Sequence, residues 1–320
     1  MKHQILLRSI VACLPMLGGC VATAGEISGT ISSTLNITED SWLTGDVTCR
    51  VEGGPCIRVA ASNITLWMLG FTMTGKADPP SGCAGAGQTP GGANAEHGID
   101  IVGQRRVEVF GPGVVQRFRG MGINLGSTRV SLKGLTVSSN CWSGIFLGSR
   151  ASDNDLEENV AVRNGSNSRF NCGGICLFNS NNNRLLKNVT SGNGYAVMNV
   201  VNFGIALSGT SRGNIILKNQ AVGNVNGLYL EPNAAQNLIQ DNNISGNPPN
   251  EVSRSAEGFL GFDIRNFAAE GANIFHNNLC ATYSGAGPRS CPSVVSGFIS
   301  LLTRGLQPDN PAATELLRRR

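Results

Sequence analysis

The feature that most constrains the fold is a pattern of asparagines that occurs twice in succession near the middle of the chain. Residues 214–224 and 237–247 both read N-x-[IL]-x-x-N-x-[AI]-x-x-N, with asparagines at i, i+5 and i+10. The short β-type run Gly227-Leu228-Tyr229-Leu230 lies between the two copies. A unit of about 23 residues that repeats with asparagines in fixed places is typical of a solenoid rather than of a compact globule.

Seven short openings of one form, a glycine followed by an apolar-x-apolar triplet, recur between residues 97 and 280. They are Gly98-Ile99-Asp100-Ile101, Gly122-Ile123-Asn124-Leu125, Gly144-Ile145-Phe146-Leu147, Gly174-Ile175-Cys176-Leu177, Gly204-Ile205-Ala206-Leu207, Gly227-Leu228-Tyr229-Leu230 and Gly261-Phe262-Asp263-Ile264. A triplet this short is stable only when stacked rungs pair it above and below, at a spacing of about 4.8 Å. We expect the apolar members to point inward and the asparagines to form ladders at turns, where asparagine tolerates a left-handed backbone.

These glycine-opened rungs and N-x-[IL]-x-x-N turns resemble the right-handed parallel β-helix proteins of the pectin-lyase-like superfamily. The resemblance covers roughly residues 50–280 and implies an all-β, right-handed parallel β-helix of about eight rungs. That superfamily includes polysaccharide lyases, hydrolases, uronan epimerases and members with no known reaction, so the fold does not fix the chemistry. The predicted organisation is a signal peptide at 1–24, a cap or first strands at 25–55, the β-helix at 56–291 and a tail at 292–320.

The N-terminus is typical of an export signal. Lys2 and Arg8 precede a short apolar stretch, and Ala22-Thr23-Ala24 provides a small-x-small cleavage pattern. We therefore expect a secreted or periplasmic protein. Leu17-Gly18-Gly19-Cys20 also resembles a lipoprotein box, which would tether the chain through Cys20. The apolar stretch is too short for a transmembrane segment.

The charge balance argues against nucleic acid as a partner. Without Lys2 and Arg8 the chain carries 23 basic and 21 acidic residues, and no basic stripe interleaved with aromatic residues is present. We expect a monomer whose partner is a polysaccharide or a cell-surface glycan.

Eight of the ten cysteines follow the predicted signal peptide, and an even number in an exported chain indicates disulfides. Short spacings favour the pairs Cys49–Cys56, Cys172–Cys176 and Cys280–Cys291, which leaves Cys83 and Cys141 to pair with each other. Eight cysteines nevertheless allow 105 pairings. A zinc site at the 172–176 pair is the alternative, but the chain has only three histidines and no second close cysteine pair.

Stacking the seven triplets predicts an outward-facing column formed by their middle residues: Asp100, Asn124, Phe146, Cys176, Ala206, Tyr229 and Asp263. The predicted catalytic residues are Tyr229, Glu231, Asp263 and Arg265, which this register places on neighbouring rungs. A tyrosine or carboxylate base, with an arginine to neutralise a uronate carboxylate, suits proton abstraction beside that carboxyl group. A plain ion-pair ladder that keeps the sheet soluble would use the same residues.

Three further predictions concern residues outside this set. A long segment from Asn247 to Leu260, with Glu251, Arg254 and Glu257, is predicted to form a wall beside these residues. His97, Asp100 and Arg58 form a second candidate near the other end of the column. His276 is predicted to be a surface-facing structural histidine.

Several motifs of catalytic relatives are missing from the sequence. The chain has no Asp-Asp followed by Gly-His-Gly, no R-x-P-x-x-R, and only the G-F-D part of the uronan epimerase motif Y-G-F-D-P-H, at residues 261–263. No cofactor or metal site is predicted. The sequence therefore predicts a β-helix that binds or processes an acidic polysaccharide, in a lyase-like or epimerase-like way by resemblance. A non-catalytic surface or adhesion-type scaffold is the alternative, and whether the chain is an enzyme stays open.

Overall fold

The computed structural model describes residues 25–77, 83, 95–165, 172–194, 202–247 and 261–285. The regular elements within these ranges are 24 β-strands, which form two parallel sheets. The predicted signal peptide, the wall at 248–260 and the tail at 292–320 lie outside the described residues.

Sheet A has fourteen strands. They are β1 (Glu26–Ile31), β3 (Ser41–Cys49), β5 (Thr65–Trp67), β6 (Thr72–Thr74), β8 (Glu108–Gln116), β10 (Ser131–Ser138), β12 (Asp155–Glu157), β13 (Val160–Val162), β15 (Arg184–Leu186), β16 (Val189–Ser191), β18 (Ile215–Leu217), β19 (Gln220–Val222), β21 (Leu238–Gln240) and β23 (Ile274–His276).

Sheet B has ten strands, one for each turn of the chain. They are β2 (Leu35–Ile37), β4 (Ile57–Val59), β7 (Ile99–Arg105), β9 (Ile123–Thr128), β11 (Ile145–Leu147), β14 (Ile175–Phe178), β17 (Phe203–Ser208), β20 (Asn226–Leu230), β22 (Ile264–Asn266) and β24 (Tyr283–Gly285).

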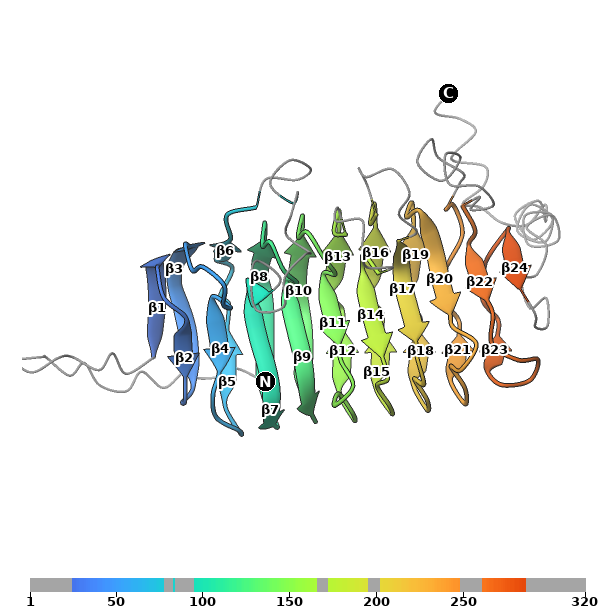
Figure 1. The fold of residues 1–320 in the computed structure, drawn as a ribbon, viewed down its shortest axis with the longest axis horizontal. Helices are drawn as coiled ribbons and strands as arrows, with labels where there is room; N and C mark the ends of the chain where they lie inside the picture. Colours follow the sequence, from blue (N-terminus) through green and yellow to red (C-terminus); the bar gives the residue numbers. More distant parts are fainter. Residues whose placement is uncertain are drawn as a thin grey trace, which may run out of the picture.

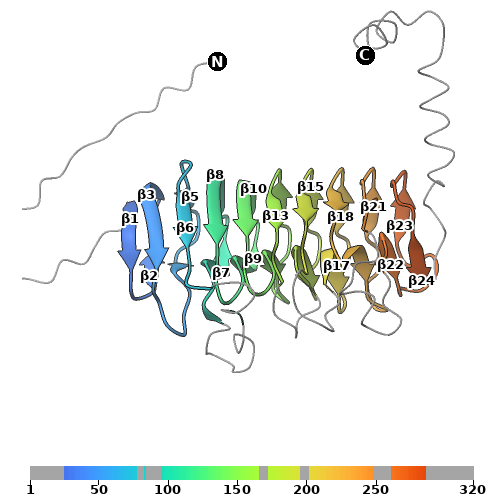
Figure 2. The ribbon, with the colours of Figure 1, turned by 90° about the horizontal axis from the view of Figure 1, so that it is seen from above.

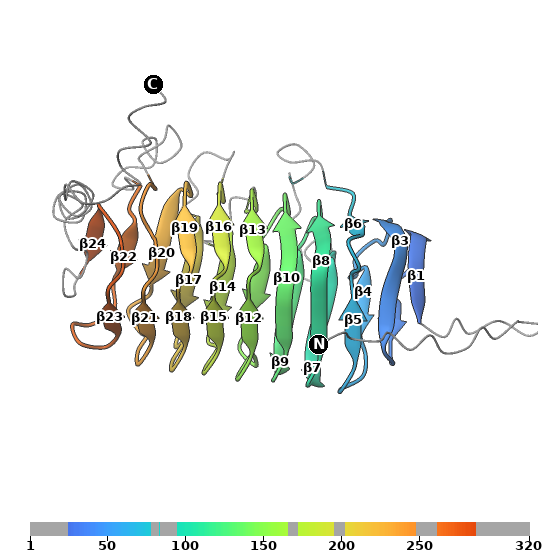
Figure 3. The ribbon, with the colours of Figure 1, turned by 180° about the vertical axis from the view of Figure 1, so that it is seen from behind.

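The strands lie side by side along the long axis in the order of the sequence, from β1 at one end to β24 at the other (Figures 1 and 3). Seen from above, sheet A and sheet B form separate layers (Figure 2). This is the predicted right-handed parallel β-helix. Sheet B has ten strands rather than about eight, because β2, β4 and β24 add turns before and after the glycine-opened triplets.

The core runs the length of the helix as columns of apolar side chains. The outer members of the triplets point inward as predicted: Ile99, Ile123, Ile145 and Ile175 are all fully buried, and so are the residues that close these triplets, Ile101, Leu125, Leu147 and Leu177. In each column, apolar residues of similar type lie above one another on neighbouring rungs. A single register of the strands therefore buries all the apolar residues of the column.

Three ladders of buried asparagines run along the turns of the β-helix. In the ladder centred on Asn188, the Oδ1 atom accepts hydrogen bonds from the backbone N–H and from Nδ2 of Asn159, each 3.0 Å long. Asn188 in turn donates from its own Nδ2 to the carbonyl oxygen of Leu156 at 2.8 Å. Every polar atom of the amide thus has a partner in a place that water does not reach, and the predicted ladders are confirmed.

The ladder asparagines themselves do not adopt the left-handed backbone, which corrects one expectation. The left-handed residue is the one before most of them, for example Glu158 (φ 55°), Lys187 (φ 54°) and Lys218 (φ 55°), and at Asn273 it is Gly271, two residues before. The tight turn is therefore made one residue earlier. The asparagine follows with an ordinary backbone and its side chain directed inward, toward the next rung.

Two of the four predicted disulfides are present, Cys49–Cys56 and Cys83–Cys141. Cys280 is also disulfide-bonded, and its predicted partner Cys291 lies outside the described residues. The prediction for Cys172 and Cys176 is wrong, because both are buried free thiols. Disulfides persist in oxidising compartments, so the protein is extracytoplasmic. Among the described residues no helix is long and apolar enough to cross a membrane.

Candidate functional site

The outer face of sheet B carries the column in which the candidate site was predicted. The register confirms the order of the column from Asp100 through Asn124, Phe146, Cys176 and Ala206 to Tyr229. The column was predicted to face solvent throughout, which is wrong for Cys176 and Ala206, because both side chains are buried. At the last rung the prediction is wrong. Tyr229 pairs with Arg265, and Leu228 pairs with Ile264, so the strand is shifted by two residues relative to the predicted triplet.

Asp263 therefore lies at the position that glycine occupies in the earlier rungs, and its side chain is 2% exposed. Its Oδ1 accepts hydrogen bonds from the backbone N–H and from Nδ2 of Asn247, each 3.0 Å long. Its Oδ2 accepts the N–H groups of Ala281 at 2.6 Å and Thr282 at 3.0 Å. Both oxygens are occupied by the scaffold, so Asp263 lies in the third ladder rather than on the outer face with the other predicted catalytic residues.

Tyr229 and Arg265 lie next to each other on neighbouring rungs, among three phenylalanines. The ring of Tyr229 stacks on Phe203 with centroids 4.2 Å apart, and it meets Phe267 edge-on at 5.9 Å. The guanidinium carbon of Arg265 lies 5.2 Å from the ring centroid of Phe267 and 5.8 Å from that of Phe262. We call Phe203, Tyr229, Phe262, Arg265 and Phe267 the aromatic–arginine cluster.

The exposure of these side chains decides which of them a ligand could touch. Phe267 is 40% exposed and Tyr229 is half-buried, whereas Arg265 is only 6% exposed and Phe203 only 2%. Arg265 thus supplies a positive charge to the floor of the cluster. The rings of Tyr229 and Phe267 form the part that faces outward.

Burial raises the pKa of Tyr229 above its usual value, and the negative charge of Glu231 raises it further, while Arg265 opposes both effects. Burial likewise lowers the pKa of Arg265, and Tyr229 partly offsets this. Tyr229 therefore keeps its proton at neutral pH. Its hydroxyl group is suited to donate a hydrogen bond or a proton, not to remove one.

Glu231 lies two residues beyond Tyr229, on the same outer face of sheet B. Its Oε2 accepts the backbone N–H of Gly209 at 2.6 Å. This bond fixes the carboxylate at the end of the neighbouring strand β17, beside the tyrosine. Of the four predicted catalytic residues, the structure thus brings Tyr229, Glu231 and Arg265 together and leaves Asp263 apart.

The buried thiols adjoin the same region. Cys172 and Cys176 form a small apolar cluster with Phe203 and Ala206, and Tyr229 packs against it. Burial raises the pKa of the Cys176 thiol well above its usual value, and the contact with Cys172 raises it further. The Cys176 thiol is therefore protonated, and both cysteine side chains fill apolar space in the cluster against which Tyr229 packs. The described residues hold no group of three or more histidines, cysteines and carboxylates able to bind a metal ion, which gives the zinc alternative no support.

The second predicted candidate, near the other end of the column, is built differently. Arg58 Nε lies 3.5 Å from Asp100 Oδ2, and Asn124 Nδ2 donates to Asp100 Oδ1 at 2.8 Å. His97 is half-buried, and its Nδ1 accepts the backbone N–H of Met121 at 3.0 Å. Burial lowers the pKa of His97 to about 4, against an opposing effect of Asp100. His97 is thus a neutral structural residue, whereas Arg58 and Asp100 form a partly exposed ion pair.

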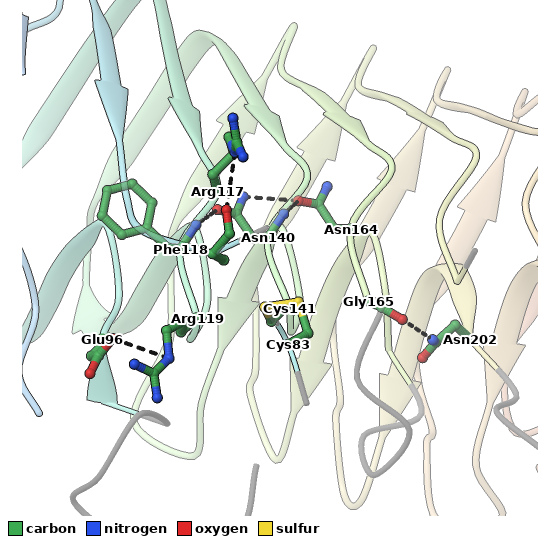
Figure 4. Close-up of a disulfide and its surroundings, with 11 residues drawn as sticks. Cys83, Glu96, Arg117, Phe118, Arg119, Asn140, Cys141, Asn164, Gly165 and Asn202 are labelled. Atoms are coloured by element: carbon green, nitrogen blue, oxygen red, sulfur yellow. Dashed lines mark hydrogen bonds and ion pairs between the residues drawn. A yellow bond between two sulfur atoms is a disulfide. The ribbon is translucent and has the colours of Figure 1, made fainter. Parts of the chain in front are cut away.

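Beside His97 lies a buried carboxylate that the sequence analysis did not single out. Glu96 Oε2 is 3.6 Å from both Lys76 Nζ and Arg119 Nε, and these residues line a cavity of about 10 Å³, room for about one water molecule. Figure 4 shows the Glu96–Arg119 pair beside the Cys83–Cys141 disulfide and the start of the third ladder at Asn140 and Asn164. The cavity is too small for a sugar. His276 is exposed, as predicted.

Three aromatic members of the cluster were missed by the sequence analysis. Phe262 was predicted to point inward as the first apolar residue of its triplet, but it is half-buried beside Arg265. Phe267 follows Arg265 by two residues, so the correct register would have placed it on the same face. Phe203 precedes a glycine-opened triplet, and nothing in the repeat pattern distinguishes it.

A family model described as the right handed beta helix region matches residues 114–285, more than half of the chain. No curated protein matches this chain. Among solved structures, a point mutant of the periplasmic alginate epimerase AlgG is similar with a TM-score of 0.51 and 15% identity, over 80% of this chain and 61% of that one.

Two tailspike proteins are also similar. The Dettilon tailspike protein has a TM-score of 0.55 and 16% identity, over 81% of this chain and 55% of that one. Tailspike protein 2 from Escherichia coli O157:H7 bacteriophage CAB120 has a TM-score of 0.52 and 12% identity, over 84% of this chain and 35% of that one. At these identities the likeness concerns the fold. The chain spans less than two thirds of the length of these three proteins.

Proposed function

Because the chain belongs to the right-handed β-helix family, whose outer sheet faces are long and rigid, we propose that it binds an extended acidic polysaccharide along the outer face of sheet B. The observation that carries this proposal is the pairing of Tyr229 with Arg265 in neighbouring rungs, with Phe203, Phe262 and Phe267 around them. The resemblance to the alginate epimerase AlgG supports the choice of an acidic polysaccharide by analogy of fold only.

Each part of the aromatic–arginine cluster suits one part of a uronate chain. Phe267 and Tyr229 offer exposed ring surface on which the apolar face of a sugar can lie. The Tyr229 hydroxyl group, protonated at neutral pH, donates a hydrogen bond to a carboxylate. Arg265 lies beneath them and attracts the same negative charge from the floor of the site.

Processing of the bound chain would use the same three polar residues. Glu231 would remove the proton beside the uronate carboxyl group, and the charge of Arg265 would stabilise the resulting anion. Tyr229, which holds its proton, would act as the acid. In the lyase version, Glu231 would take the C5 proton, the electron pair would form the C4=C5 double bond, and the C4–O bond would break as Tyr229 protonates the leaving oxygen. In the epimerase version, Tyr229 would instead return a proton to C5 from the opposite face of the sugar.

A non-catalytic scaffold is the second candidate, and one observation favours it. Both oxygens of Asp263 are held by the third ladder and the last turn, which removes one of the two predicted carboxylates from the site. Under this proposal the same face binds glycan at a cell or polymer surface and releases it unchanged.

The test separates binding from chemistry. The full protein is titrated calorimetrically with oligomers of mannuronate, guluronate and galacturonate. It is then incubated with the corresponding polymers while the absorbance of a 4,5-double bond and hydrogen exchange at C5 in heavy water are followed. Binding without either signal leaves the scaffold, and no binding to any uronate overturns the proposal.

Two variants assign the binding to the cluster. Tyr229→Phe keeps the stack on Phe203 but removes the hydroxyl group, and Arg265→Gln removes the charge. Each is expected to weaken uronate binding about tenfold or more, the loss of one charge-assisted contact. The matched control is Arg58→Gln, which removes a cation from the other end of the same outward column. Equal losses in Arg58→Gln and Arg265→Gln would point to diffuse charge attraction instead.

A further inference from the structure

The outer face of sheet A carries an aromatic surface far from the aromatic–arginine cluster. Trp42 pairs with Trp67, and Trp67 pairs with Phe110, so three consecutive rungs place a large aromatic ring in one outward column. All three side chains are half-buried rather than buried. The Cα atoms of the first and third lie about 10 Å apart along the axis, because rungs repeat at about 4.8 Å.

Further apolar residues extend this column on one side. Leu69 is 55% exposed, and Pro112 is exposed on the next rung, where the backbone N–H of Gly70 donates to its carbonyl oxygen at 2.6 Å. Phe71, two residues after Leu69, is half-buried and packs against the apolar core. We call Trp42, Trp67, Leu69, Phe71, Phe110 and Pro112 the tryptophan patch. Contiguous apolar surface of this kind marks an interaction site more often than scattered single residues do.

Elsewhere on the outer face of sheet A, neighbouring rungs carry charged side chains instead of aromatic rings. On the rungs after Phe110 the column continues with Lys133 and Glu157, which form an ion pair of 2.9 Å. Arg184 and Asp155 form a second ion pair, with Nη2–Oδ2 at 2.6 Å, on the neighbouring column. Charged pairs of this type are ordinary solvated sheet surface, so the aromatic rungs stand out against them.

Carboxylates flank the patch on both sides. Asp40 lies two residues before Trp42 on the same face, and Glu108 lies two residues before Phe110. On the other side of the patch, the carboxylate of Asp46 contacts the backbone of Thr72. The Oδ1 atoms of Asp40 and Asp46 accept the backbone N–H groups of Thr65 and Thr72, at 2.8 Å each. These bonds fix both carboxylates and leave the outer oxygens facing solvent, since both residues are exposed.

We propose that the tryptophan patch is a binding site for a neutral oligosaccharide, distinct from the proposed uronate site on sheet B. Flat rings offer a negative face to the C–H groups of a sugar, and fixed carboxylate oxygens accept hydrogen bonds from its hydroxyl groups. No member of the patch is basic, and Lys133, which lies next to Phe110, is already paired with Glu157. The fixed carboxylates of Asp40 and Asp46 therefore disfavour an acidic polysaccharide and an anionic lipid surface.

The test uses the tryptophans as their own probe. Trp42 and Trp67 are two of the three tryptophans in the chain, and the third, Trp142, is only 6% exposed. The full protein is titrated with cellohexaose, mannohexaose, laminarihexaose, chitohexaose and, for comparison, a mannuronate hexamer, while fluorescence and its quenching by acrylamide are recorded. A saturable change with at least one neutral hexamer, accompanied by protection from acrylamide and absent with the mannuronate hexamer, is the expected result.

Variants separate recognition from folding. Trp67→Ala is expected to weaken binding of that neutral hexamer at least about tenfold, as for the central residue of a binding surface. Trp67→Phe, which keeps a flat ring, should retain most of the affinity. The matched control is Ile274→Ala on the same sheet, because Ile274 is 63% exposed but lies many rungs from the patch. Uronate binding at sheet B should be unchanged in all three variants.

Three results would overturn the proposal. One is the absence of a saturable signal with every neutral hexamer at millimolar concentration. Another is an equal affinity of Trp67→Ala and the unchanged protein. The third is a patch that is instead protected from acrylamide by neutral or anionic phospholipid vesicles, or by self-association on concentration. None of these results bears on the uronate site, which lies on the other sheet.

Discussion

Asn247 and Asp263 are joined by the same two hydrogen bonds that join successive asparagines along the ladders, but here the acceptor is a carboxylate oxygen. The second oxygen of Asp263 then accepts two backbone N–H groups, of Ala281 and Thr282, which an amide could not do with its nitrogen. The third ladder therefore ends on a residue that also fixes the start of the last turn, just before β24.

Replacing Asp263 by asparagine should destabilise the protein even though it restores the repeat. The amide nitrogen would face the N–H groups of Ala281 and Thr282, and leaving these without an acceptor costs about 2–4 kcal/mol. Urea unfolding measures this loss. The matched control is Asp241→Asn, since Asp241 lies at a turn where Asn277 and Gln240 hold it at the surface. A variant of unchanged stability that loses only an enzymatic activity would return Asp263 to a catalytic role.

Replacing the ladder residue Asn188 by alanine should cost more than most core substitutions. The change leaves the backbone N–H of Asn159 and the carbonyl oxygen of Leu156 without these partners in a buried turn, and Asn159 Nδ2 keeps only its bond to the Leu132 carbonyl oxygen. We expect a loss of about 3–5 kcal/mol in the free energy of unfolding. Asn36→Ala, at an exposed asparagine of β2, is the control and should change stability little. Similar stabilities for the two variants would mean that the ladder contributes little beyond the backbone pairing.

The repeat pattern predicted the two features that depend on local residue types, the inward apolar columns and the asparagine ladders. It failed at Gly261-Phe262-Asp263-Ile264 for a physical reason. A shift of two residues leaves every side chain of a strand on its own face, so alternation cannot detect it. What fixes the register is the hydrogen bonding of Asp263, which binds Asn247 as an asparagine would. The chemistry of a single side chain thus decided which residue faces Tyr229.

The cysteines show a different limit. A spacing of seven residues joins the end of β3 to the start of β4 across a turn, and there the spacing predicted the disulfide. The spacing of four between Cys172 and Cys176 is shorter, yet Cys176 lies in β14 and is packed against Ala206 and Phe203. Bonding depends on the directions of the two Cβ atoms, and spacing does not encode them.

The stability of the protein should fall between pH 6.5 and about pH 4 because of His97. Its pKa is lowered from 6.5 to about 4 in the folded state, so in this window the unfolded chain binds more protons. Stability is then complete above pH 6.5 and decreases as the pH falls, by about 2 kcal/mol between pH 6.5 and pH 5. Urea unfolding at pH 7 and pH 5 measures the difference.

The variants His97→Asn and His276→Gln isolate this effect. An asparagine at position 97 can accept the N–H of Met121 in place of Nδ1 and does not titrate, so its stability should depend much less on pH in this range. His276 is exposed, and its replacement should leave the slope as it is. A slope that persists unchanged in His97→Asn would assign the acid sensitivity to other groups.

The two buried thiols give the last prediction. The chain without residues 1–24 has eight cysteines, and the described disulfides leave Cys172 and Cys176 reduced. Ellman's reagent should find almost no reactive thiol in the native protein, because both are buried and the pKa of Cys176 is raised well above its usual value. Unfolding in guanidinium without reductant should then release two thiols. Cys172→Ser with Cys176→Ser should abolish them, whereas release of none from the unchanged protein would show that the two sulfurs are bonded after all.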